Sequence, residues 1–169
     1  MRPGLKRMKG TQMTASLTFF PVCNGDMTLL ELDNEQKLLI DLHVRKAADD
    51  PEDDTPDVMA MLGERLTRDE KGRLFVDGFL LSHPDKDHIG GLERHFHLGP
   101  PDEWDEEDDK ILIREIWSSL LVFRRASLRL VLCPDAKALA KEERRRVALH
   151  RDTRSPCIDG NRTRILGED

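Results

Sequence analysis

The chain has 169 residues, a length typical of one domain or of part of a larger one. Acidic residues outnumber basic ones by 33 to 27, and the net charge of −6 argues against a protein that coats nucleic acid through its overall charge. No apolar run reaches the roughly 20 residues that a membrane span needs, and no signal-peptide core follows the basic start. We therefore expect a cytoplasmic protein without a membrane partner.

The N-terminal part of the chain predicts a tail followed by three strands. Residues 1–14 hold basic side chains and few that could pack, so we expect a tail ahead of a domain that spans residues 15–169. Apolar runs separated by turn residues predict an opening strand and then a hairpin, over residues 16–22, 27–32 and 37–41. The hairpin ends in Asp41, which places an acid at the end of a buried strand.

An acidic loop and a helix come next. Residues 47–57 are rich in Asp and predict a solvated loop. Thr55 is suited to the N-cap and Pro56 to the first helical position, and apolar residues then recur at helical spacing. The pattern predicts a helix over residues 56–67.

The rest of the chain predicts strands around one long helix. After a turn at residues 69–72, a buried strand is expected over 74–82, in which Gly78 favours a bulge. Gly99 and two prolines interrupt the chain before a second acidic segment. The later elements are a strand, an exposed helix and a last short strand, over residues 111–118, 136–151 and 161–166. Residues 120–132 give no clear prediction.

One segment carries a pattern typical of a metal site. Four side chains that can bind a metal follow a buried strand within six positions: His83, Asp85, Asp87 and His88. In an extended chain the first three project to one side, and a turn at the following Gly90-Gly91 pair brings in His88. A helix that starts near Leu92 would point its positive end at this site and favour an anionic ligand.

The segment HPDKDHIGG resembles the metallo-β-lactamase superfamily, whose signature is H-x-[HD]-x-D-H-x-G-G after a buried strand. The Asn24-Gly25-Asp26 turn and the strand LLID that ends in Asp41 also resemble the segments that precede this signature in the family. The form SHPDKDHIGG looks most like the branch that includes DNA-uptake channel proteins. The resemblance covers about residues 16–99. It implies an α+β protein of the αββα sandwich type, of which this chain is the N-terminal portion.

The resemblance also implies a role for each residue of the motif. His83 and Asp85 would serve a first metal position, and Asp87 and His88 a second. Asp87 would also be catalytic, because it would orient the attacking hydroxide, and Asp41 would support the ligand loop. The expected cofactor is one or two zinc ions. Asp85 stands where many members have histidine, and this harder ligand widens the choice towards manganese or iron.

Several residues outside the motif are further candidates for the site or for the surface. Downstream the family supplies another histidine, a bridging aspartate and a final histidine. Asp169 bears only a weak resemblance to the bridging aspartate. His43 is an outside candidate because it lies two residues after Asp41, whereas a surface position is expected for His95, His97 and His150. The arginines at 124, 125, 129 and 144–146 predict a solvated helix face. Cys23, Cys133 and Cys157 are odd in number and far apart, which disfavours disulfides and a zinc site made of cysteines.

The sequence leads to a metal-dependent hydrolase that acts on a phosphodiester or another ester-type substrate, either a small molecule or a nucleic acid. Two alternatives stay open: a catalytically inactive or truncated metal-binding module, and a partner-binding fragment whose acidic segments contact a basic protein. Half of a sandwich leaves apolar strands uncovered. We therefore expect the chain to associate with itself or with a missing C-terminal half.

Overall fold

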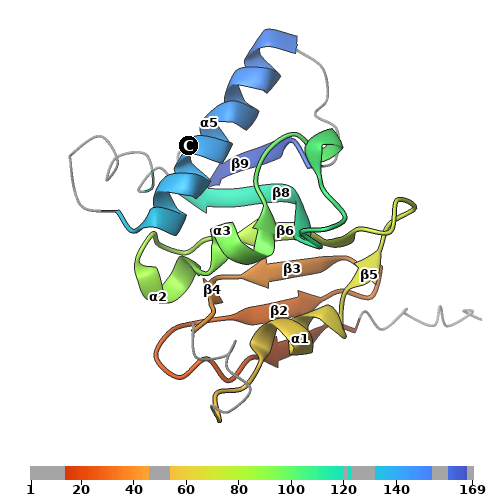
Figure 1. Cartoon of the computed structure of the whole chain (residues 1–169), viewed down its shortest axis with the longest axis vertical. Helices are drawn as coiled ribbons and strands as arrows, with labels where there is room; N and C mark the ends of the chain where they lie inside the picture. Colours follow the sequence, from red (N-terminus) through yellow and green to blue (C-terminus); the bar gives the residue numbers. More distant parts are fainter. Residues whose placement is uncertain (1–13, 46–53, 120–121, 123–131, 154–159, 167–169) are drawn as a thin grey trace, which may run out of the picture.

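The computed structural model describes residues 14–45, 54–119, 122, 132–153 and 160–166 (Figure 1). Most of the predicted tail over 1–14, of the acidic loop 47–57 and of the stretch 120–132 lies outside these residues. So do Cys157, Asp169 and the arginines at 124, 125 and 129.

A mixed sheet organises the described part of the chain. Eight strands belong to it, in the order β1-β2-β3-β6-β8-β7, with β5 paired to β6 and β9 paired to β8. The central strands are β3 (Lys37–Ile40), β6 (Leu74–Leu80) and β8 (Ile111–Ser119), and they run parallel to one another. Strand β2 (Thr28–Glu31) pairs antiparallel with β3 as the predicted hairpin, and the predicted opening strand, β1 (Ser16–Phe19), pairs antiparallel with β2 at the edge of the sheet.

Short elements complete the architecture. The remaining strands are β4 (Leu42–His43), β5 (Thr67–Arg68), β7 (Phe96–His97) and β9 (Arg162–Leu166). The helices are α1 (Val58–Gly63), α2 (Lys86–Ile89), α3 (Leu92–His95) and α5 (Pro134–Thr153), with a 3-10 turn, η2, at Pro101–Glu103. The fold is thus a mixture of helix and sheet, as the sequence predicts. None of the described helices is long and apolar enough to cross a membrane.

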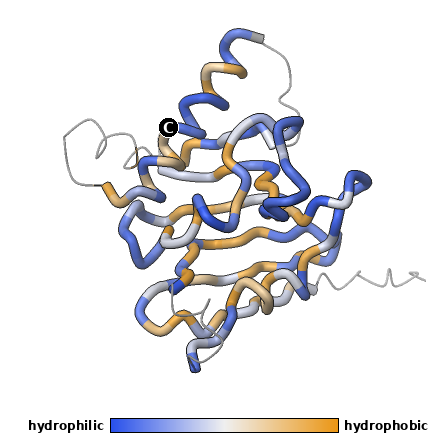
Figure 2. The backbone as a smooth tube through the Cα atoms, viewed as in Figure 1, coloured by the Kyte–Doolittle hydropathy of each residue, from blue (hydrophilic) through white to orange (hydrophobic). Residues whose placement is uncertain are grey.

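The core lies between the helices and one face of the sheet. Leu29, Leu39, Phe79 and Ile116 stand opposite one another on four neighbouring strands, and each is fully buried. Helices α1, α3 and α5 lie on the same side of the sheet in Figure 1, and the ring of Phe96 packs 6.2 Å from that of Phe79. Figure 2 shows the apolar residues concentrated along the strands and the polar ones along the loops.

The opposite face of the sheet is apolar as well. Direct cross-strand partners share a face, and two such rows bring large apolar side chains together. We call this surface the outer face and define it by Leu17, Phe19, Leu30, Leu38, Ile40, Leu80 and Trp117. Phe19 is 75% exposed and Leu17 56% exposed, and both lie on the edge strand β1.

Three details of the predicted elements are wrong. Helix α1 is capped by Asp57 rather than Thr55, because the Asp57 carboxylate accepts the backbone N–H groups of Met59 and Ala60. The helix ends at Gly63 because residues 67–68 pair with β6 as β5. The register of β6 with β8 is the same on either side of Gly78, so no residue is inserted in this pairing and the predicted bulge is absent from it.

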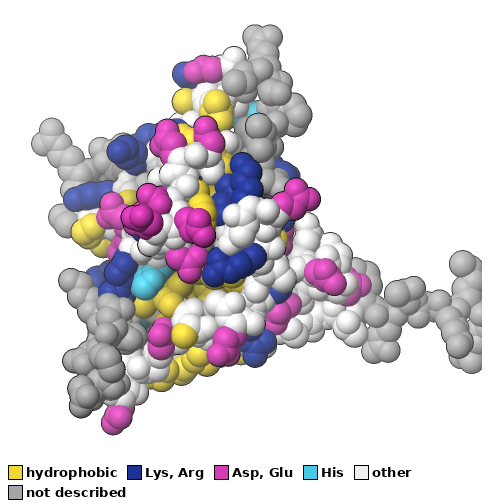
Figure 3. Space-filling model, turned by 45° about the vertical axis from the view of Figure 1, so that its right-hand side comes forward, with side chains coloured by type: hydrophobic (Ala, Val, Ile, Leu, Met, Phe, Trp, Pro, Cys, Tyr) yellow, Lys and Arg dark blue, Asp and Glu magenta, His cyan; other side chains and the backbone are white. Residues whose placement is uncertain are grey.

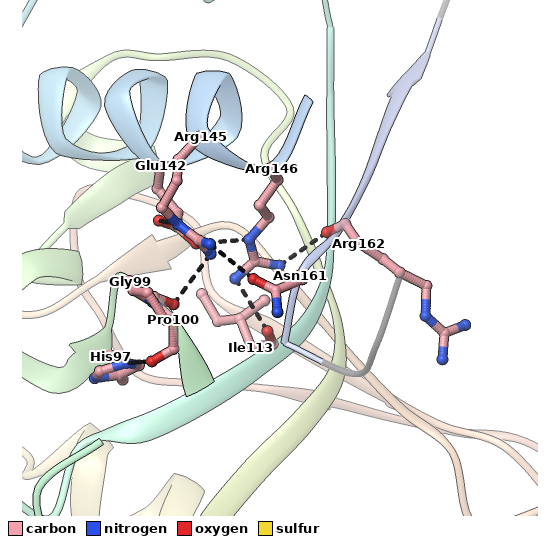
Figure 4. A network of polar contacts seen from close by, with 9 residues as sticks. All are labelled: His97, Gly99, Pro100, Ile113, Glu142, Arg145, Arg146, Asn161 and Arg162. Carbon is pink, nitrogen blue, oxygen red and sulfur yellow. Dashed lines mark hydrogen bonds and ion pairs between the residues drawn. The ribbon is translucent and has the colours of Figure 1, made fainter. Parts of the chain in front are cut away.

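Helix α5 is not the exposed helix that its composition predicts. Ala136, Leu139 and Ala140 on one face are buried, and Arg146 is only 1% exposed. The Arg146 guanidinium donates to the Glu142 carboxylate at 2.7 Å and to the carbonyls of Arg162 and Ile113 at 2.8 and 3.1 Å (Figure 4). Each of its three guanidinium nitrogens therefore has an acceptor, and one of these is a carboxylate, which is what makes burial of the charge tolerable.

Arg145 is half-buried beside it and corrects the same prediction. Its guanidinium donates to Glu142, to the side chain of Asn161 and to the carbonyl of Gly99. The predicted solvated face of the 144–146 run is therefore wrong for two of its three arginines. These contacts tie α5 to the start of β9 and to the loop before η2.

Candidate metal site

The motif lies at the carboxyl ends of the parallel strands. Asp41 directly follows β3, and Ser82 and His83 follow β6, so the topology brings them to one edge of the sheet. Strand β4 then runs beside the motif, with bridges from Leu42 to Ile89 and from His43 to Gly90. A backbone bond of 2.8 Å from Val44 to the carbonyl of Gly90 fixes this arrangement.

Asp41 is the buried polar centre of the site. Its side chain is 5% exposed and accepts three hydrogen bonds, from the Ser82 backbone N–H at 2.8 Å, from the Ser82 hydroxyl at 2.6 Å and from His88 Nδ1 at 3.0 Å. Its φ of 54° lies in the left-handed region, which a residue other than glycine rarely adopts. The backbone turns sharply here, and this turn accompanies the three contacts of the carboxylate with the motif.

The two motif histidines lie against each other, each beside an acid. The ring centroids of His83 and His88 are 3.6 Å apart. His83 Nε2 lies 3.9 Å from the Asp85 carboxylate, and His88 Nε2 lies 3.7 Å from the Asp87 carboxylate. The four predicted ligands therefore form two adjacent histidine–carboxylate pairs.

The local conformation differs from the extended ligand loop that the sequence predicts. Asp87 and His88 belong to the helical turn α2, for which Asp85 is the N-terminal flanking residue. Pro84 does keep the start of the motif out of the helix, because the residue before a proline is disfavoured in α conformation. The helical turn, rather than strand alternation, sets the two acids beside the two rings.

The N-terminus of α3 does not offer the anion site that the sequence predicts. This helix has only four residues, and the Asp135 carboxylate accepts the backbone N–H groups of Gly91 at 3.1 Å and Glu93 at 2.9 Å. An acid from α5 thus already occupies the place in which a ligand anion was expected.

Asp26 is a member of the site that the sequence analysis treated only as part of a turn. Its carboxylate lies 3.6 Å from His88 Nδ1, and its backbone N–H donates to the carbonyl of Asp87 at 3.2 Å. Among the described residues, Asp26, Asp41 and His88 form the one group of three whose ligand atoms all lie within 4.8 Å of one another. The Gly25-Asp26 step was the signal, because a glycine lets the turn approach the motif closely.

The hydrogen bonds separate two places in which a cation could sit. Asp41 is the poorer candidate for a metal ligand, since three of the roughly four acceptor sites of its carboxylate already accept hydrogen bonds. Because a carboxylate only accepts, the His88 Nδ1 that faces it carries a proton, and in the neutral ring the lone pair is then on Nε2. The lone pair points towards Asp87, so the side that bears Asp85 and Asp87 is better suited to a cation than the side that bears Asp26.

The remaining histidines have other surroundings. The ring of His43 packs against Gly25 and Gly90, and its buried Nδ1 finds no hydrogen-bond partner among the described residues. His95 Nε2 accepts from Arg94, and His97 Nε2 lies 2.8 Å from the carbonyl of Pro100. His150 is exposed on α5. Cys23 and Cys133 are free thiols in the described part of the chain.

Comparison with protein-family models, with curated proteins and with solved structures finds no match to this chain. The assignment of a function therefore depends on the geometry of the motif and on its resemblance to a known signature.

Proposed function

We propose that the protein is a metal-dependent hydrolase of phosphodiester or other ester-type substrates, with the metallo-β-lactamase signature as its metal-binding motif. The observation that carries the proposal is the pair of histidines that follows β6, each with Nε2 beside a carboxylate. In this proposal His83 and Asp85 hold one ion and Asp87 and His88 hold a second.

The distances support a shared cation better than direct contact. Separations of 3.7 and 3.9 Å between nitrogen and oxygen are too long for hydrogen bonds. Two ligand atoms on one tetrahedral zinc ion lie about 3.4 Å apart, given bonds of about 2.0–2.2 Å. Movements of a few tenths of an ångström, on the scale set by these bond lengths, would let each pair bind an ion.

The ion and the protein side chains would contribute different parts of the chemistry. When bound, zinc, manganese or iron lowers the pKa of a water ligand and polarises the bond to be cleaved. The exposed Asp87 carboxylate can accept a proton from that water and orient it, while Asp41 and Ser82 hold the rings in place. Two adjacent pairs suit two ions, which would favour a phosphodiester because its two reacting oxygens can each be stabilised.

The alternative is a metal-binding or interaction module without catalysis. Each histidine–carboxylate pair supplies two ligands, whereas a catalytic zinc site usually has three protein ligands and one open position. Among the described residues, the additional side chain near the motif is Asp26, on the Nδ1 side of His88. This observation favours weak binding and poor alignment of a nucleophile in the 169-residue chain.

A titration with two matched variants tests the location of the site. We titrate the metal-free protein with zinc or manganese and measure binding by calorimetry. We expect the wild type to bind the metal and Asp87→Asn to weaken binding at least about tenfold. Asp26→Asn removes an acid of similar exposure on the other side of His88 and should change affinity little. The reverse order of the two variants would place the ion with Asp26 and would contradict the proposal.

A second measurement separates the hydrolase from the inactive module. Cleavage of bis(p-nitrophenyl) phosphate with added metal, lost in Asp87→Ala, supports the hydrolase. Metal binding with no cleavage supports the module. Cleavage that survives Asp87→Ala would mean that the reactive group lies elsewhere in the chain.

A further inference from the structure

Ser82 connects the buried Asp41 carboxylate to the ring of His83. The Ser82 hydroxyl donates to Asp41 Oδ2 at 2.6 Å, and the same oxygen lies 2.9 Å from His83 Nδ1. A hydroxyl has one proton to give, and here the carboxylate, which can only accept, takes it. The contact with His83 must then run the other way, with Nδ1–H as the donor and the hydroxyl oxygen as the acceptor.

One carboxylate therefore determines which ring nitrogen carries the proton in both motif histidines. Asp41 accepts from His88 Nδ1 directly and from His83 Nδ1 through Ser82, so both rings carry their proton on Nδ1. Both lone pairs are then on Nε2, which are the two atoms that face Asp85 and Asp87. A histidine can bind a metal only through an unprotonated nitrogen, so this proton arrangement decides where binding can occur.

We propose that Ser82 is a positioning residue, which fixes the tautomer of His83 so that Nε2 is the ligand atom. The inference rests on the proposed function for its purpose, but the proton arrangement itself belongs to the metal-free protein. The backbone N–H of Ser82 also bonds to Asp41 at 2.8 Å, so the backbone and the hydroxyl of Ser82 both donate to the same carboxylate. Ser82 is exposed, and loss of its hydroxyl removes no core packing.

The test reads the tautomers by NMR. Long-range proton–nitrogen spectra of the metal-free protein at pH 8 distinguish protonated from unprotonated ring nitrogens. We expect Nδ1 to be protonated in both His83 and His88 of the wild type. In Ser82→Ala, His83 should populate the Nε2-protonated form, while His88 stays unchanged because its bond to Asp41 is direct. Ser82→Thr keeps a hydroxyl and should restore the wild-type spectrum.

Metal affinity gives the second readout. Zinc binding should weaken about 10–100-fold in Ser82→Ala and return to the wild-type value in Ser82→Thr. Ser16→Ala is the matched control, because it removes a serine hydroxyl that donates to the Glu31 carboxylate far from the motif. An unchanged His83 tautomer in Ser82→Ala overturns the inference. The expected change in tautomer in a protein that binds no metal supports the role of Ser82 and rejects the proposed function.

Discussion

Close backbone contacts hold the candidate site together at the scale of single residues. Gly25 has a φ of +140° and lies so near the motif that a Cβ there would stand 2.5 Å from the carbonyl oxygen of Asp87 and 2.7 Å from the ring of His43. Neither neighbour can yield easily, because one is backbone and the other is packed against Gly90. The turn that carries Asp26 can therefore approach α2 only with glycine at position 25.

Gly25→Ala should cost more stability than a matched change at Gly72. Both glycines have positive φ, so alanine is strained at each by about 1 kcal/mol, but a side chain at Gly72 meets open space. The close contacts at Gly25 should add about 1–3 kcal/mol to the loss in unfolding free energy, measured by urea denaturation. Equal losses in the two variants would show that the turn can move away from the motif at no cost.

At the scale of residues, only part of the candidate site can be predicted from the sequence. The spacing of His83, Asp85, Asp87 and His88 predicts a cluster, and the structure does set these side chains in two close pairs. The position of Asp26 could not be predicted from spacing, because it depends on a tertiary approach of residues some 60 positions apart. The same is true of Asp135, which occupies the end of α3.

At the scale of elements, the longer strands and the long helix α5 were predicted at their positions, and the shortest elements were not. Strands such as β3, β6 and β8 are short apolar runs, and burial against neighbours on both sides makes such runs easy to recognise. Helix α2 has four residues, too few to show a helical period. Helix α5 misleads because its buried face contains Glu142, Glu143 and Arg146, which composition alone assigns to solvent.

The buried acid of α5 should make stability depend on pH. Glu143 is fully buried, donates nothing when ionised, and accepts a hydrogen bond from Ser118. Burial raises the pKa of Glu143 to about 7 from 4.5, against the opposing effects of Ser118, Arg146 and Arg144. Glu142 lies on the same helix and adds to the rise in pKa.

The sign of the pH effect follows from proton binding. Between pH 4.5 and about 7 the folded protein keeps a proton on Glu143 that the unfolded chain has lost. This contribution to stability is complete below pH 4.5 and is lost as the pH rises through 7. Glu143→Gln, an analogue of the protonated acid, should therefore gain stability relative to wild type between pH 4.5 and 8, by about 3 kcal/mol at most.

Urea denaturation at several pH values measures this difference. Glu64→Gln is the control, because Glu64 is exposed at the end of α1, and its difference from wild type should stay nearly constant over the same range. A constant difference for Glu143→Gln as well would show that Glu143 is ionised throughout in the folded protein.

For the whole molecule, a bound metal should stabilise the fold. Asp41 orients the rings of the motif directly and through Ser82, and it meets them only in the folded state, so an ion bound by the motif binds the folded protein preferentially. Zinc at 100 times its dissociation constant should add about 2.7 kcal/mol, or roughly 5–10 °C in melting temperature for a chain of this size. EDTA should reverse the shift, and Asp87→Asn should reduce it. A melting temperature that does not respond to zinc or EDTA would contradict coupling between metal and fold.

The outer face sets the expected behaviour of the molecule in solution. Leu17 and Phe19 are exposed on it, and they lie on an edge strand whose outward backbone groups can pair with another chain. The side of the molecule that Figure 3 draws is different, since charged side chains of both signs are interspersed there with apolar ones. An apolar sheet face of this kind favours association.

We therefore expect reversible self-association that weakens when Phe19 is replaced by serine. Burial of a phenylalanine side chain contributes about 1.5–3 kcal/mol, so Phe19→Ser should raise the dissociation constant about 10–100-fold, measured by light scattering over a range of protein concentrations. Met61→Ser is the matched control, because Met61 is 39% exposed on α1, which covers the other face of the sheet. A wild-type chain that stays monomeric at all concentrations and unfolds cooperatively would show that the outer face is tolerated as surface. Equal effects of the two substitutions would place the contact elsewhere.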